Sequence, residues 1–494
     1  MTPSSTLTSS RLDLVPTSVL SSGNLEFAVA EFPGERKLVV VGNPNTMQGL
    51  EFDSTSILDG KTLLICPFNH KNAEFIRFHL PWTNPIPLGL KTSAGMGDRI
   101  GLATPGHINA VRQTGCAVTP ILAQQSIREM TRTGRSPEDV MDAALWGVLQ
   151  EGWRSGFGAD ADHLKTVEDI DLCLKAGFTF FTIDPGLHVD DHAETADLAQ
   201  LRNLADLLPA DVNPAASGLA GKVFDIEGKR IEITEPVLLK AAVKYGKAVA
   251  HVAAMYHHLI SAAAGKPVEL EVSVDETEQP TTPAEHIYVA SELKRLGVNW
   301  VSLAPRFTGR FEKGVDYIGD LTRFEQEFGM HAAIARLMGP YKISLHSGSD
   351  KFSIYPIAMK HTRGLVHLKT AGTSYLEALR AIATIDPDFF RQIYRFAREH
   401  YTTDKASYHV SAELERAPLA VGVSDFTTLL DQFDAREILH VTFGSVLTDR
   451  FECNGEGFYP KFMRILRDNP DTYKQMLTKH FIRHLSPFSE KVNS

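Results

Sequence analysis

The sequence predicts an α/β protein built around a (β/α)₈ TIM barrel, and two observations support that fold class. Short β-rich runs alternate with longer helical patterns from about residue 91 to about residue 380. Repeated strand–helix units give parallel strands with right-handed crossovers, and eight such units suggest closure into a barrel. Polar residues also follow seven of these strands where each one ends, and barrel enzymes build their active sites at that face. An open doubly wound sheet is the competing architecture.

The eight strands are expected at the β-rich runs. These are 95–101, 117–124, 157–163, 179–184, 268–274, 299–304, 342–346 and 365–369. Helical patterns lie between them, among others at 167–176, 235–263, 284–296 and 321–337. A further helix should begin at Ser136, because Ser136-Pro137-Glu138-Asp139 combines an N-cap residue, a proline in the first turn and two acids.

The flanking segments suggest three units. Residues 1–90 contain two strand-like runs, 37–41 and 62–66, and are expected to form an N-terminal α/β cap. The barrel should span 91–380, with an insertion near 209–233 whose glycines suggest a short hairpin. Residues 381–494 have a mainly helical pattern and are expected to form a C-terminal extension.

Composition narrows the class of protein. The chain has 494 residues, of which 43% are hydrophobic and 22% charged, which excludes wholesale disorder. The net charge is −10 with no basic block, so a nucleic-acid partner is not expected. No run of about 18 apolar residues is present, so no membrane span is expected. The four cysteines form no CxxC pair and no signal peptide precedes them, which predicts a cytoplasmic protein with reduced thiols.

Three histidines at predicted strand ends are candidate metal ligands. Asp162-His163 ends the third strand, where the imidazole can face a metal while the adjacent carboxylate acts as acid or base. His346 ends the seventh strand, and the two candidates support each other. His367, in the eighth strand, is the third, although it could equally be a packed histidine of the barrel interior.

Carboxylates on the fifth strand point to the same site. Strand alternation puts Glu269, Glu271, Ser273 and Asp275 on one face. An inward carboxylate is costly to bury without a partner, and a metal among His163, His346 and Glu271 would supply one. We therefore expect a divalent metal ion, and these ligand types suit zinc, manganese, nickel or cobalt equally. Asp162 and Glu271 are the candidate catalytic carboxylates.

Other polar residues at the strand ends are candidate substrate contacts. They are Gln124, Ser126, Thr182, Asp184, Arg306, Ser347, Asp350, Lys351 and Lys369. In the loop after His346, small residues let backbone N–H groups approach an anion and Lys351 supplies charge. The glycines at 95, 97 and 101 have the wrong spacing for a dinucleotide loop, and the sequence contains no Walker loop, GxSxG elbow or HExxH helix.

Over about residues 160–375 the chain resembles the class II, metal-dependent ketose-bisphosphate aldolases. Asp162-His163 resembles the family's Asp-His motif, in which the aspartate protonates the cleaved carbon and the histidine binds the metal. The run 345–349 (LHSGS) resembles its Leu-His-Gly-Gly-Ser-Gly turn, and 269–271 (ELE) its Glu-bearing strand. The family's remaining metal histidine is not visible, so the third ligand stays open between His367 and Glu271. Asp350 would repel a phosphate dianion, so this loop better suits a polyol or a single carboxylate.

Across nearly its whole length the chain more closely resembles the tagaturonate epimerases, which interconvert tagaturonate and fructuronate. The resemblance rests on GADADHLKT, FFTIDPG, EVSVDETEQPTTPAEH, SLHSGSDKFSIYP and HLKTAGTSYLEALR. It implies an isomerase of hexuronate catabolism that acts on a small sugar acid. The inverted carbon lies β to the ketone, so enolisation alone cannot invert it, whereas retro-aldol cleavage and re-addition can. A metal that polarises the ketone and its α-hydroxyl would assist both steps.

Two other functions remain open from the sequence. One is a class II type aldolase or lyase that releases its fragments, and the other is a non-catalytic barrel subunit that stabilises a partner aldolase. A hidden nicotinamide, allowing oxidation and re-reduction at the inverted carbon, is a further alternative mechanism. The sequence also leaves open a homo-oligomer, and it does not rank sugar acids against neutral ketoses.

Overall fold

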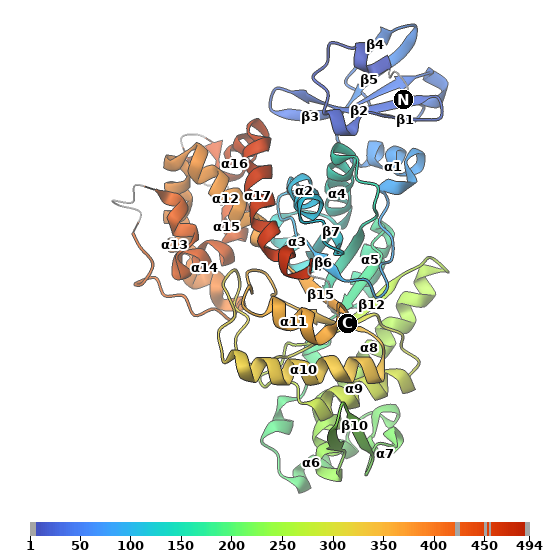
Figure 1. Cartoon of the computed structure of the whole chain (residues 1–494), viewed down its shortest axis with the longest axis vertical. Coiled ribbons are helices and arrows are strands. Elements are labelled where there is room, and N and C mark those ends of the chain that lie inside the picture. Colours follow the sequence, from blue (N-terminus) through green and yellow to red (C-terminus); the bar gives the residue numbers. More distant parts are fainter. Residues whose placement is uncertain (1–5, 420–424, 449–451, 454–455, 490–494) are drawn as a thin grey trace.

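Eight parallel strands close into a barrel at the centre of the molecule in this computed structural model, which describes residues 6–419, 425–448, 452–453 and 456–489 (Figure 1). The order around the barrel is β6-β7-β8-β9-β12-β13-β14-β15, and β15 closes on β6. The strands are β6 (Ser93–Gly95), β7 (Thr119–Ser126), β8 (Gly158–Leu164), β9 (Phe180–Ile183), β12 (Glu269–Val274), β13 (Ser302–Pro305), β14 (Lys342–Leu345) and β15 (Val366–Lys369). The predicted barrel is thus confirmed.

The first strand lies earlier in the sequence than expected. We predicted it at 95–101, but β6 covers Ser93–Gly95 and the following residues form a loop. Asp98 holds that loop, because its carboxylate accepts hydrogen bonds from the backbone N–H groups of Ile100, Gly101 and Ala103. Because these three N–H groups donate to Asp98, they are not available for pairing with a neighbouring strand.

Helices surround the barrel. They are α2 (Thr104–Thr114), α3 (Ile127–Thr133), α4 (Pro137–Glu151), α5 (Val167–Ala176), α8 (Glu235–Ala263), α9 (Pro283–Arg295), α10 (Leu321–Met338), α11 (Tyr355–Thr362) and α12 (Thr373–Ile385). The capping prediction at Ser136 is confirmed, since its side chain accepts from Asp139 N while the Asp139 carboxylate accepts from Ser136 N. No helix in the described part of the chain has the length and apolar character needed to cross a membrane.

The N-terminal segment forms an antiparallel sheet outside the barrel. Its strands are β1 (Leu20–Ser22), β2 (Leu25–Phe32), β3 (Glu35–Gly42), β4 (Ser54–Leu58) and β5 (Lys61–Cys66), in the order β1-β2-β3-β5-β4. The sheet and α1 (His70–His79) share a hydrophobic cluster with Leu145, Trp146 and Leu149 of α4. Figure 1 shows the sheet at one end of the long axis of the molecule.

An insertion between β9 and α8 lies at the opposite end (Figure 1). It contains α6 (Leu198–Asp206), α7 (Pro214–Ser217) and an antiparallel pair, β10 (Val223–Ile226) and β11 (Lys229–Glu232). The glycines of this segment therefore do mark a hairpin.

The C-terminal part is helical and packs on one side of the barrel (Figure 1). It comprises α13 (Pro387–Asp404), α14 (Phe433–Val441), α15 (Phe443–Thr448), a small pair β16 (Glu452–Cys453) and β17 (Glu456–Gly457), α16 (Phe458–Asp468) and α17 (Pro470–Leu485). α17 packs closely against α2, where a Cβ at Gly106 would lie 2.5 Å from Leu477 Cβ. Only glycine permits that approach.

Candidate active site

Four charged side chains occupy the interior of the barrel toward its carboxyl end. Asp160 and Asp162 come from β8, Glu271 from β12 and Lys369 from β15, and all are buried. Barrel interiors are usually filled by branched apolar residues, and buried charges are costly unless they are paired. This interior is therefore built for chemistry rather than for packing alone.

His163 is oriented by its neighbour Asp162. His163 Nδ1 lies 2.6 Å from Asp162 Oδ1, and the His163 backbone has a positive φ of 55° that turns the side chain at the end of β8. Burial alone would raise the pKa of Asp162, but the positive charges of His163 and Lys369 hold it well below its usual value. Because Nδ1 is engaged, Nε2 is the nitrogen left for a ligand.

His346 lies between two carboxylates of the β12 segment. Its Nε2 is 2.7 Å from Glu271 Oε1 and its Nδ1 is 3.3 Å from Asp275 Oδ1. Burial alone would lower the pKa of His346, but Asp275 and Glu271 raise it to about 10. Ser273 donates a short hydrogen bond to Asp275 and thereby fixes that carboxylate. Metal binding at this imidazole would release a proton.

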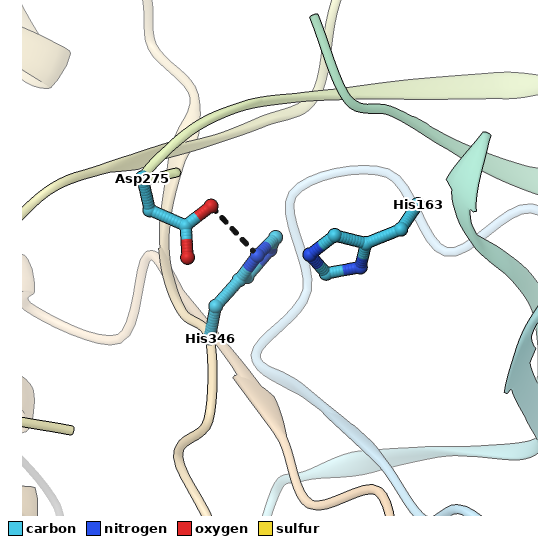
Figure 2. A group of neighbouring side chains, drawn as sticks. All are labelled: His163, Asp275 and His346. Carbon is cyan, nitrogen blue, oxygen red and sulfur yellow. Dashed lines mark ion pairs between the residues drawn. The ribbon is translucent and has the colours of Figure 1, made fainter. Parts of the chain in front are cut away.

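A group of three residues could hold a metal ion, and we call it the metal group: His163, His346 and Asp275. Ligand atoms from the three residues lie within 4.8 Å of one another, and the two imidazole ring centroids are 5.0 Å apart. Figure 2 shows a ring nitrogen of His163 and the Asp275 carboxylate both pointing toward His346. A two-histidine, one-carboxylate set suits zinc and other first-row divalent metals. In each histidine the other nitrogen faces a carboxylate, as is usual for metal-binding histidines.

A second group overlaps the first on the open side of His163. It consists of His163, Asp184 and Glu276, and Glu276 is exposed. Lys165 lies there too, with its Nζ 3.1 Å from Asp184 Oδ2 and 3.5 Å from Glu276 Oε2. Carboxylates paired to a lysine at the rim are better placed to contact a substrate than to bind a second ion.

Comparison with known proteins identifies the family. Residues 15–488 match the sequence profile of the tagaturonate epimerases (UxaE). The chain belongs to the tagaturonate epimerase family. A tagaturonate/fructuronate epimerase of Thermotoga maritima is 43% identical over 453 residues, covering 91% of this chain and 92% of that protein. The native and glycerol-bound crystal structures of the fructuronate-tagaturonate epimerase UxaE of Cohnella laeviribosi superpose with a TM-score of 0.91 at 37% identity, and the matches cover 98% of this chain and 97% of each relative.

In this epimerase His367 lies deeper in the barrel than His163 and His346. His367 is fully buried, its Nδ1 lies 2.9 Å from Ser93 Oγ, and its Nε2 has no hydrogen-bond partner among the described residues. Burial lowers the pKa of His367 to about 3. Within the described chain, the groups of potential ligands include Asp275 and not His367. The alternation of the fifth strand, which put Asp275 on the inward face with Glu271, was the sequence signal for this candidate ligand.

Three predicted substrate contacts are engaged elsewhere in the epimerase. Lys351 Nζ donates to the carbonyls of Glu312 at 2.7 Å and Ser349 at 3.2 Å, and also to that of Val315. Asp350 pairs with Arg436, with Nη2 3.1 Å from Oδ1. Ser126 accepts from Glu129 N as the N-cap of α3. Each of these side chains therefore supports a loop or a helix.

The other predicted contacts lie in or around the barrel mouth. Thr182 Oγ1 donates to Asp160 Oδ1 at 2.9 Å, and Asp184 Oδ1 accepts from Gly186 N at 2.8 Å. Gln124 is buried against Gly95, and neither of its amide atoms has a partner in the described structure. Arg306 and Ser347 follow β13 and β14 and are partly buried.

Proposed function

We propose that this chain interconverts tagaturonate and fructuronate with the aid of a divalent metal ion held by His163, His346 and Asp275. The names of the relatives support the substrate pair. The main support for a bound metal is that two imidazoles and one carboxylate converge. In addition, a separate carboxylate contacts the other nitrogen of each imidazole, Asp162 at His163 and Glu271 at His346. Two histidines that only packed in a barrel would not need that arrangement.

The position of the inverted carbon calls for carbon–carbon bond cleavage. This carbon carries a hydroxyl and lies β to the ketone, so its hydrogen is not acidic. Removing the hydroxyl proton lets the bond between the α and β carbons break, which gives an aldehyde and an enediolate. Rotation of the aldehyde and bond formation on its other face return the epimer. A bound divalent ion would supply Lewis-acid stabilisation of the ketone and its neighbouring hydroxyl.

Asp162 is positioned to move the hydroxyl proton. Its Oδ1 is held by His163 and by Lys369 at 2.6 Å each, whereas Oδ2 has no hydrogen bond to the described residues. The lowered pKa keeps Asp162 ionised, so Oδ2 is available to accept a hydrogen bond from the substrate hydroxyl. Glu271 lies behind His346, so its contribution is to orient that imidazole. Gln124, Asp184 and Arg306 remain the substrate contacts of this proposal.

The substrate in this proposal is a small sugar acid without a phosphate ester. Lys351 is fully buried and already donates to three carbonyls, so it is not free to bind a phosphate in the loop after β14. We further propose that the reaction takes place in the cytoplasm as a step of hexuronate breakdown, and that the chain can assemble as a homo-oligomer.

Proton NMR of the purified protein with tagaturonate, before and after chelation and with the metal returned, tests the proposed function. We expect fructuronate to form, to stop forming after chelation, and to form again when a divalent metal is added. Accumulation of free three-carbon fragments would instead indicate an aldolase. Conversion that survives exhaustive chelation would contradict the metal, and release of a nicotinamide on denaturation would then favour transient oxidation. No conversion with metal restored would contradict the epimerase.

A further inference from the structure

One buried lysine connects the carboxylates behind both histidines. Lys369 Nζ donates hydrogen bonds of 2.6 Å to Asp162 Oδ1 and to Thr182 Oγ1. It also lies 2.9 Å from Glu271 Oε1 and 3.0 Å from Asp160 Oδ2. Its side chain is only 3% exposed, so these contacts are made without competition from bulk water.

Each of the two carboxylates, Asp162 and Glu271, contacts a different imidazole. Asp162 Oδ1 contacts Lys369 Nζ and His163 Nδ1, and Glu271 Oε1 contacts Lys369 Nζ and His346 Nε2. A single oxygen on each carboxylate is therefore shared between the lysine and one histidine. The opposite nitrogens, His163 Nε2 and His346 Nδ1, are the ones left to face the ion.

We infer that Lys369 is a positioning residue that fixes both imidazoles for metal binding through Asp162 and Glu271. The inference rests on the proposed function and deepens it, because it says what sets the geometry of the metal group. Carboxylates that orient metal-binding histidines contribute 10- to 100-fold to affinity in other proteins, and here one cation anchors two of them. A lysine suits this place because its compact ammonium offers three donors to acceptors from different strands.

Metal binding by the full-length chain tests the inference with Lys369→Met and a matched control. Lys342 is the control, because it is also a fully buried lysine of the barrel interior, its Nζ donates to Ser93 Oγ at 3.1 Å, and it forms no ion pair in the described structure. Both variants and the unchanged protein are stripped of metal, checked for folding by thermal unfolding, and titrated with Co²⁺ by calorimetry and visible absorption.

We expect Lys369→Met to bind Co²⁺ about 10- to 100-fold more weakly, with a changed absorption spectrum, and Lys342→Met to match the unchanged protein. Co²⁺ binding by Lys369→Met with unchanged affinity and spectrum would overturn the inference, whatever happens to turnover. Failure of the unchanged protein to bind Co²⁺ would instead contradict the proposed metal itself, so the two failures are distinguishable.

Thr182→Val is a second variant in case Lys369→Met does not fold. It removes one hydrogen-bond acceptor of Lys369 and leaves every charge in place. We expect a smaller loss of Co²⁺ affinity, about 3- to 10-fold, in the same direction. Unchanged affinity and spectrum in Thr182→Val, with a folded protein, would count against the positioning role.

Discussion

Asp275 and His367 differ in their relation to the metal group, and single substitutions can separate them. Asp275 lies beside His346 at the barrel mouth, whereas His367 is enclosed in the interior beneath it. We expect Asp275→Asn to weaken Co²⁺ or Zn²⁺ binding by about 100-fold or more, because it removes a charged ligand. His367→Gln should leave affinity within about threefold, because Gln can still bond Ser93. Calorimetric titration of the two folded variants measures both effects.

The opposite order of affinities would indicate a different position for the ion. If His367→Gln lost the metal while Asp275→Asn kept it, the site would lie deeper in the barrel, near Glu271 and the unpaired Nε2 of His367. Equal losses in both variants would mean that the interior rearranges on binding. The ratio of the two affinities therefore decides between Asp275 and His367 as the third ligand.

The sequence indicates which residues reach this site but not which atoms they use. Strand ends and alternation place His163, His346, Glu271 and Asp275 at one end of the barrel. Whether Glu271 could bind an ion or instead lies behind His346 depends on the orientation of the His346 ring, and Glu271 contacts both that ring and Lys369 on another strand. Such side-chain geometry depends on barrel closure and leaves no pattern along the chain.

The C-terminal helix α17 stabilises the loop that follows His346, a candidate metal ligand. Asp350 N donates to His484 Nε2 at 2.9 Å, and Asp350 Oδ1 lies 3.4 Å from His480 Nε2. Asp350 also accepts from Thr373 Oγ1 at 3.2 Å. No local sequence pattern indicates these contacts of Asp350, because its partner His484 lies 134 residues further along the chain. A role of this loop in substrate binding stays a prediction, and the observed contacts of its charged residues Asp350 and Lys351 hold the loop in place.

Stability should therefore fall at mildly acidic pH through α17. Burial lowers the pKa of His480 to about 4 and that of His484 to about 3, so both stay neutral in the folded protein. In the unfolded chain each takes up a proton near pH 6.5. The stabilisation is thus complete above about pH 6.5 and is lost as the pH falls toward 4, by up to about 1.4 kcal/mol per pH unit for each histidine.

Unfolding curves between pH 7.5 and 5 measure this effect. His484→Gln keeps an acceptor for Asp350 N but cannot titrate, so its melting temperature should fall less steeply with acid than that of the unchanged protein. His192→Gln is the control, because the His192 side chain is 90% exposed. Parallel curves for His484→Gln and the unchanged protein would show that His484 is already protonated, or exposed, in the folded state.

At the scale of the whole molecule, the N-terminal sheet contacts the barrel away from the candidate site. It packs on the second half of α4, through Leu145, Trp146 and Leu149. Helices of a barrel run antiparallel to its strands, so this half of α4 lies toward the amino ends of the strands, opposite the metal group. The segments that approach the carboxyl end are instead C-terminal, such as α14 and α17 through Arg436 and His484. The sequence predicted both flanking units, but their docking depends on contacts between distant segments.

Trp146→Ala tests whether the N-terminal sheet serves stability rather than catalysis. Trp146 is 6% exposed, stacks on Phe68 with ring centroids 4.2 Å apart, and lines a cavity of about 790 Å³ between the sheet, α4 and α17. Its removal should lower the free energy of unfolding by about 3–5 kcal/mol and speed proteolytic release of the sheet. Co²⁺ affinity and kcat/KM should stay within about twofold, since the metal group lies at the other end of the strands.

Phe78→Ala is the matched control, because the Phe78 side chain is 79% exposed, and it should change neither the stability nor the activity. A Trp146→Ala protein that is stable but inactive would mean that the sheet controls the site across the length of the barrel.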